Sequence, residues 1–182
     1  MTGNKSTDSS NVTKKKKRVV KAVSIICIIL LSAIVFNQLY PLGSLPLPSQ
    51  IVVYYEGNEH YITPDSIDYY SIYMAVNARL VVSMNVAPLR VTDMNIQHFK
   101  EQETTIEFLY DKSKEIRFIQ LPTTIISAKD VRRTLFPLTG QESELMFFAD
   151  ESNKYRSGPF GPLGNAEPLL SNVRRIIHLL SK

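Results

Sequence analysis

The stretch TTIEFLYDKSKEIRFIQ, residues 104–120, decides the fold class that this 182-residue chain predicts. Apolar and polar residues alternate over 104–110 and again over 115–120, which is the period of a half-buried β-strand. The four residues between them, Asp111-Lys112-Ser113-Lys114, are polar and predict a turn. We therefore expect an antiparallel hairpin here, the clearest one in the chain.

Other elements follow from local patterns on either side. Strand-forming runs at Ile51–Tyr55 and Glu59–Thr63 flank Glu56-Gly57-Asn58 and predict a second hairpin. Further strands are expected at 79–85 and 144–149. Residues 92–101 are compatible with either a short helix or a loop. Helices are expected from Thr63-Pro64-Asp65, from the capping-box pattern Ser127–Asp130 up to Pro137, and over 165–182.

These elements predict an α+β domain of antiparallel hairpins with three or so helices packed on one face. Strands occur in neighbouring pairs and do not alternate with helices, which argues against a doubly wound sheet. The domain would cover residues 50–182.

The charge is distributed unevenly along the chain. Residues 1–21 hold seven Lys and Arg against one Asp, a net charge of +6, whereas the remaining residues have a net charge of −2. A domain that binds nucleic acid needs a basic face to neutralise phosphates. The slightly acidic domain therefore predicts no nucleic-acid partner.

An apolar run at residues 19–40 predicts a membrane-spanning helix. Its 22 residues correspond to about 33 Å of helix, enough for a hydrocarbon core of about 30 Å. A buried core helix and a cleaved signal peptide are the alternatives, but the run is apolar on every face and has no good small-residue cleavage site. The basic flank consists of Lys14, Lys15, Lys16, Lys17 and Arg18.

The basic flank predicts the orientation of the chain. By the positive-inside rule, the tail 1–18 stays in the cytoplasm, and residues 41–182 lie outside the cell membrane. Residues 41–49 contain three prolines and predict a semi-extended linker. The exported part has no Cys, which favours a bacterial envelope over a eukaryotic secretory route.

The loop at residues 157–164 is the most unusual exported stretch. Its alternating Gly and Pro residues predict a stiff loop that presents Phe160 and Leu163 to a partner, with Gly158 and Gly161 setting the backbone. The alternative is a purely structural connection in which these side chains fill the core.

No pattern predicts a catalytic, metal-binding or cofactor-binding residue. The histidines are isolated, a G-x-S-x-G nucleophile elbow does not occur, and the carboxylate pair Asp65 and Asp68 is too small a set for calcium. Six tyrosines between Tyr54 and Tyr73 suit a binding surface, but they equally suit a half-buried sheet and helix face.

The sequence therefore predicts a single-pass membrane protein whose extracytoplasmic domain acts by binding. Its expected partners are the lipid bilayer and another envelope protein or ligand, and no cofactor is expected. Two alternatives stay open, a membrane-tethered small hydrolase and a structural or assembly factor of the envelope. The hydrolase would use Asp65, His98, Asp150 and Glu151.

Overall fold

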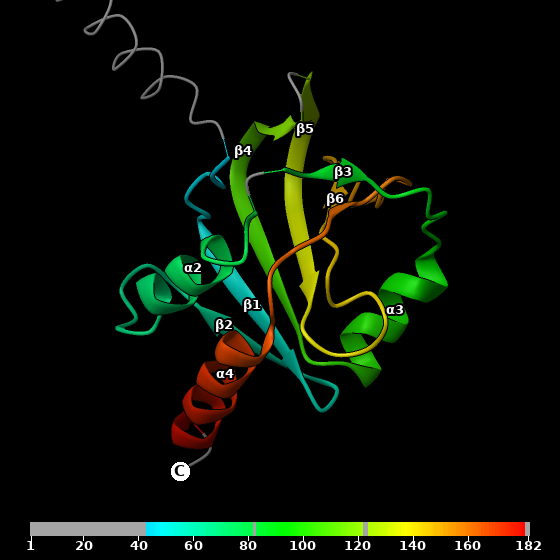
Figure 1. Ribbon diagram of the computed structural model, residues 1–182. Helices are drawn as coiled ribbons and strands as arrows, with labels where there is room; N and C mark the ends of the chain where they lie inside the picture. Colours follow the sequence, from blue (N-terminus) through cyan, green and yellow to red (C-terminus); the bar gives the residue numbers. More distant parts are fainter. Residues whose placement is uncertain (1–42, 82, 122–123, 181–182) are drawn as a thin grey trace, which may run out of the picture. The chain divides into compact units, whose positions relative to one another are not determined.

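The computed structural model describes residues 43–81, 83–121 and 124–180 (Figure 1). In chain order, its elements are β1 (Gln50–Tyr55), β2 (Asn58–Ile62), α2 (Tyr69–Asn77), β3 (Asn85–Val86), α3 (Asp93–Gln102), β4 (Thr105–Gln120), β5 (Thr124–Pro137), β6 (Phe147–Ala149), β7 (Phe160–Gly161) and α4 (Glu167–Leu180).

One antiparallel sheet organises these residues. Its strand order is β2-β1-β4-β5-β6, and the short strands β3 and β7 pair separately. The two longest strands, β4 with 16 residues and β5 with 14, run side by side through the middle of the fold (Figure 1). Every strand pair in the sheet is antiparallel.

Helices cover both faces of this sheet. Alternate residues of β1 and β4, such as Val53 and Phe108, join the buried faces of α2 and α4 in the main hydrophobic core. The opposite face packs against α3, where Phe99 lies 5.2 Å from Phe147 of β6 between ring centroids. Because both faces are covered, the first half of β4 is buried along nearly its whole length.

The predicted hairpin at 51–63 is confirmed. Glu56 and Gly57 form a two-residue turn with φ angles of 51° and 74°, and Tyr55 pairs with Asn58 across it. Positive φ at both positions matches the turn that suits the twist of a hairpin. The helices predicted around Tyr69 and over the C-terminal segment are also present, although the first begins at Tyr69 and not at Thr63.

The hairpin predicted over 104–120 is wrong, because β4 passes straight through Asp111–Lys114 as one strand. The register shifts twice, between Leu109 and Lys114 and between Lys114 and Ile116, so the extra polar residues are absorbed as bulges. The helix predicted after Ser127 is also wrong, since this segment is β5 and pairs with β4. Pairing with a neighbouring strand thus overrides the local helix signal.

The predicted fold class is wrong as a result. Five of the described strands form one continuous antiparallel sheet, and not a set of separate hairpins under helices. The described residues contain three helices, two on one face of the sheet and one on the other. Of the described residues in the strand expected at 79–85, only Asn85 belongs to a strand, β3. The strand expected at 144–149 is reduced to the three residues of β6.

The apolar segment 19–40 and its basic flank lie outside the described residues. No helix within the described part of the chain has the length and apolar character needed to cross a bilayer.

The described part of the predicted linker packs onto the domain. Leu45 is buried in the core, its N–H donates to Asn77 Oδ1 at 2.9 Å, and its carbonyl accepts from the Tyr73 hydroxyl at 2.8 Å. The Gly43 N–H donates to the carbonyl of Arg117 on β4 at 3.1 Å. Residues 43–49 thus contact the folded domain and are not separated from it.

Candidate functional site

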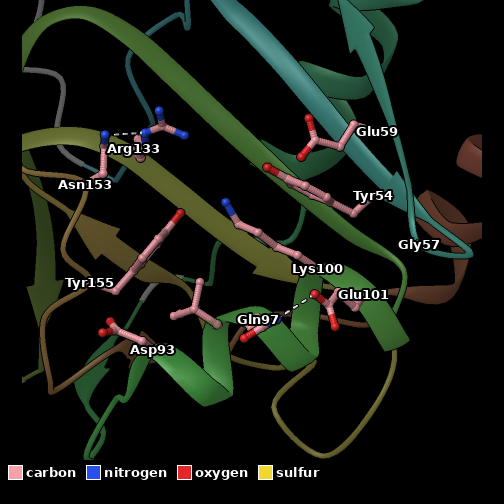
Figure 2. Close-up of a pocket in the computed structure, with 11 residues that line it drawn as sticks. Tyr54, Gly57, Glu59, Asp93, Gln97, Lys100, Glu101, Arg133, Asn153 and Tyr155 are labelled. Atoms are coloured by element: carbon pink, nitrogen blue, oxygen red, sulfur yellow. Dashed lines mark hydrogen bonds between the residues drawn. The ribbon is translucent and has the colours of Figure 1, made fainter.

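A pocket of about 430 Å³ lies beside the start of β4, between the β1–β2 hairpin, α3 and the loop that follows β6 (Figure 2). The following residues line it: Tyr54, Gly57, Glu59, Asp93, Ile96, Gln97, Lys100, Glu101, Arg133, Asn153 and Tyr155. Charged and amide side chains dominate this wall, with two tyrosine rings among them. Its composition suits a polar ligand better than an apolar one.

Local structure holds α3 in position above the sheet. The Thr92 hydroxyl accepts from the Asn95 N–H at 3.3 Å, and the Asn95 side chain accepts from the Thr92 N–H at 3.1 Å, which forms a capping box. The Thr105 hydroxyl donates to the carbonyl of Phe99 at 2.7 Å and joins the end of α3 to β4. These contacts place Lys100 directly over β4.

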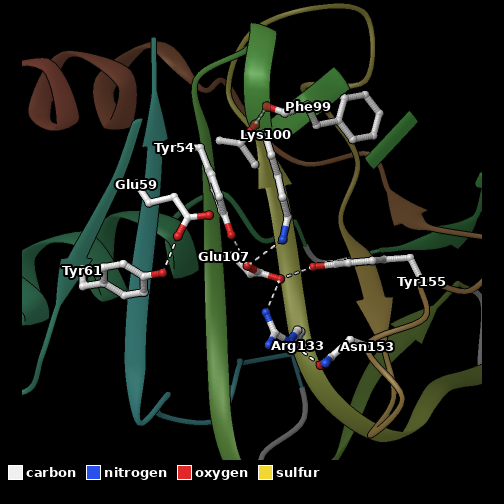
Figure 3. A network of polar contacts seen from close by, with 10 residues as sticks. Tyr54, Glu59, Tyr61, Phe99, Lys100, Glu107, Arg133, Asn153 and Tyr155 are labelled. Carbon is white, nitrogen blue, oxygen red and sulfur yellow. Dashed lines mark hydrogen bonds and ion pairs between the residues drawn. The ribbon is translucent and has the colours of Figure 1, made fainter. Parts of the chain in front are cut away.

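Glu107 of β4 is fully buried and lies behind the pocket wall, where it is bonded to four of the side chains that line the pocket. One carboxylate oxygen, Oε2, accepts from the Tyr54 hydroxyl at 2.7 Å and from Lys100 Nζ at 3.0 Å (Figure 3). The other oxygen, Oε1, accepts from the Tyr155 hydroxyl and from Arg133 at 3.4 Å. Four donors therefore satisfy one buried carboxylate, and they come from β1, α3, β5 and the loop after β6.

Lys100 lies between two aromatic rings. Its Nζ is 4.8 Å from the centroid of the Tyr54 ring and 5.8 Å from that of Tyr155. Ring faces attract an ammonium group electrostatically at such distances. The wall of the pocket thus already accommodates one ammonium group, supplied by the protein itself.

The protonation of this cluster follows from its contacts. Burial opposes ionisation of Glu107, but the Lys100 ammonium and the hydrogen bonds from Tyr155 and Tyr54 outweigh it and hold the pKa of Glu107 below its ordinary value. Burial, together with the nearby Glu107 charge, raises the pKa values of the Tyr54 and Tyr155 hydroxyls. Glu107 is therefore ionised and both tyrosines are neutral at pH 7.

The rim of the pocket is acidic. Its carboxylates are Glu59, Asp93 and Glu101. Glu59 accepts from the Tyr61 hydroxyl and Glu101 from Gln97. Among residues 43–81, 83–121 and 124–180, no ion pair to any of the three rim carboxylates is found. The lining residues and the buried Glu107 behind them comprise four carboxylates and two cations, Lys100 and Arg133, so this group of side chains has a net charge of −2 at neutral pH.

This arrangement of charged and aromatic side chains is suited to binding a polar ligand. All four donors around Glu107 are engaged with it. The pocket lining contains no Ser, Cys, Thr or His, and its candidate acid–base groups are the carboxylates of Glu59, Asp93 and Glu101. Within the described ranges, no group of three or more His, Cys, Asp or Glu side chains is placed to hold a metal ion.

The predicted contact loop lies elsewhere. Phe160 and Leu163 are only 5% and 4% exposed and belong to the main core. Gly161 is required because a Cβ there would lie 2.7 Å from the carbonyl oxygen of Glu144, and Gly158 has a φ of +79°. Gly158 and Phe160 line a separate pocket of about 370 Å³. The apolar side chains of the loop thus fill the core, which is the structural alternative.

The four residues considered for a hydrolase have separate partners. His98 on α3 lies 3.5 Å from Glu103, Asp150 contacts Ser152 and Arg156, and Glu151 accepts from Ser113. Asp65 is exposed in the turn before α2. The structure brings only the neighbours Asp150 and Glu151 into one pocket.

Sequence analysis missed Glu107 and Lys100. Glu107 stands between Ile106 and Phe108, and a charged residue inside an apolar strand was the available signal. Of the six tyrosines, Tyr54 contributes to the pocket, whereas Tyr69, the first residue of α2, is buried and its hydroxyl donates to the carbonyl of Pro48.

Comparison of the chain with protein-family models, curated proteins and solved structures finds no match.

Proposed function

We propose that this chain is a membrane-anchored binding protein. Its folded domain lies outside the membrane, and the pocket above Glu107 binds a small ligand that carries an ammonium group. The observation that carries the proposal is the acidic rim, which adds three carboxylates to a wall that already holds the ammonium group of Lys100 between two tyrosine rings. A cationic ligand would relieve the net charge of −2.

The geometry supports a ligand of modest size. A volume of about 430 Å³ is within the usual range for small-molecule sites. The ammonium group would meet Asp93 and Glu101 at the rim, where both side chains are exposed and able to adjust. Arg133, which also hydrogen-bonds Asn153 at 2.6 Å, would accept a carboxylate if the ligand is zwitterionic.

The cellular location rests on sequence. The apolar segment 19–40 is long enough to anchor the chain in a membrane, and the basic residues before it favour a cytoplasmic N-terminus. We therefore place the pocket outside the cell membrane. Another envelope protein stays an alternative partner, and the ligand could equally be a group on such a protein.

Ligand titration of the full chain in detergent micelles tests this proposal. Putrescine, spermidine, choline and L-lysine are the ammonium probes, with glucose and acetate as uncharged and anionic probes. Heat of binding and thermal midpoint are both measured. At least one ammonium probe should bind and raise the midpoint, because a ligand that binds only the native state stabilises it.

Two rim variants identify the site. Asp93→Asn and Glu101→Gln remove one negative charge each from exposed positions, so each should weaken ammonium binding several-fold at low salt. Glu167→Gln removes the same charge from the start of α4, outside the pocket, and is the matched control. Binding that all three variants leave unchanged, or binding of glucose or acetate alone, would contradict the proposal.

A further inference from the structure

The end of the sheet opposite the Glu107 pocket carries exposed apolar side chains. β4 and β5 pair there from Ile116 and Ala128 as far as Gln120 and Thr124. Four side chains on and beside this end, which we name the tip patch, are between 37% and 60% exposed: Val81, Val86, Leu121 and Ile125.

No charged residue lies within the two segments that build this end. The sequence contains no Asp, Glu, Lys or Arg from 80 to 89 or from 118 to 128. Hydrogen bonds join the segments: the Met84 N–H donates to the carbonyl of Ile119 at 3.0 Å, and the Leu121 N–H donates to Ser83 Oγ at 3.2 Å. Soluble surfaces usually intersperse charges among exposed apolar groups, so this end is unusual for a surface that faces water.

The chain enters the domain at this same end. The Gly43 N–H is bonded to Arg117 of β4, and the Ser49 N–H is bonded to Leu109, so the chain runs from the tip toward the pocket (Figure 1). Three residue steps separate Gly43 from Tyr40, the last residue of the apolar segment 19–40. They span at most about 11 Å.

We infer that the tip patch docks on the lipid bilayer in which segment 19–40 anchors the chain. The short connection holds the uncharged end of the sheet within reach of the headgroup layer, where apolar side chains insert about 5–10 Å. This inference rests on the anchoring part of the proposed function and is independent of the ligand. Glu107 of β4 precedes Leu121, the residue after the end of β4, by 14 positions, so the pocket would stand up to about 45 Å from the patch.

Tryptophan fluorescence tests the docking directly, because the chain contains no Trp. Leu121→Trp places a single probe in the tip patch, and Asn58→Trp places one at the exposed far end of the β1–β2 hairpin. The full chain is reconstituted in vesicles of phosphatidylcholine and phosphatidylglycerol with brominated acyl chains. Ile125→Trp is a second tip probe in case Leu121→Trp disturbs folding, which circular dichroism reports.

The tip probe should be quenched at least about twofold more strongly than the Asn58 probe, and its emission should shift to shorter wavelength. Equal quenching of the two probes in carbonate-washed vesicles that retain the chain would overturn the docking and leave the anchoring intact. Docking on a second copy would give this same equal quenching together with a concentration-dependent emission shift. Loss of the chain on carbonate washing would overturn the anchoring and the docking together.

Discussion

Replacing Lys100 with methionine removes one ammonium group from the buried cluster and little else. Methionine has a side chain of similar length, so the packing between the Tyr54 and Tyr155 rings is largely kept. The change leaves the carboxylate of Glu107, which is fully buried, without the cation that lies 3.0 Å from its Oε2.

The size of the stability loss on Lys100→Met depends on the partners that Glu107 keeps. Removing one partner of a buried ion pair costs about 3–5 kcal/mol. Lys100 is 22% exposed, and Glu107 keeps its bonds from Tyr54, Tyr155 and Arg133. We therefore expect a smaller loss, of about 2–3 kcal/mol in the free energy of unfolding, in line with one hydrogen bond to a charged group.

The stability that Lys100→Met removes should depend on pH. The pKa of Glu107 is below its ordinary value in the folded domain, so its ionised form stabilises the fold above the unfolded pKa of about 4.3. That stabilisation disappears as the pH falls through the lower, folded-state pKa. The difference between wild type and Lys100→Met should therefore be full at pH 7 and shrink below about pH 4.

Urea unfolding of the full chain in micelles measures this difference, with near-ultraviolet circular dichroism of tyrosine as the signal. Lys112→Met is the matched control, because Lys112 is exposed on β4 and its loss changes the net charge by the same amount. We expect the control to change stability by less than about 0.5 kcal/mol. A Lys100→Met loss no larger than the control, or one that does not change with pH, would refute this account of the network.

Three further predictions address the core, the autonomy of the domain and its topology. Phe160→Ala should lower the free energy of unfolding by about 3–5 kcal/mol, because the ring is buried and its centroid lies 4.9 Å from that of Phe148. The control Ile67→Ala, at an exposed position, should lower it by less than about 0.5 kcal/mol. Equal melting points of the two variants would place Phe160 outside the core. A fragment of residues 43–182 should unfold in one cooperative thermal transition, and a metal chelator should leave its midpoint unchanged. A fragment that folds only after metal is added would contradict our description of the site. External protease on intact cells should remove the domain, and protection until the membrane is broken would exclude the proposed orientation.

Local patterns were sufficient for some elements. The β1–β2 hairpin was predictable because Glu56 and Gly57 provide a tight turn between two short strands, and its pairing needs nothing distant. The final helix was predictable because apolar residues recur along it at helical spacing, from Leu169 to Ile177.

The candidate site was harder to predict because its residues are distant in sequence. Tyr54, Lys100, Glu107 and Tyr155 lie on four separate segments, and each looks ordinary in its own surroundings. The alternation around Glu107 predicted a strand with one face in water. Only the position of α3 over that face turns an exposed acid into a buried one with four donors.

The sequence by itself determined the uneven charge, the apolar run at 19–40, the first hairpin and the α2 and α4 segments, because each depends on residues within a few turns of one another. Tertiary structure alone decided that Asp111–Lys114 continues a strand and that the segment after Ser127 is β5. These two segments favour a turn and a helix locally. Their mutual hydrogen bonds, and the core packed against both faces of the sheet, outweigh preferences of about 1 kcal/mol or less per residue.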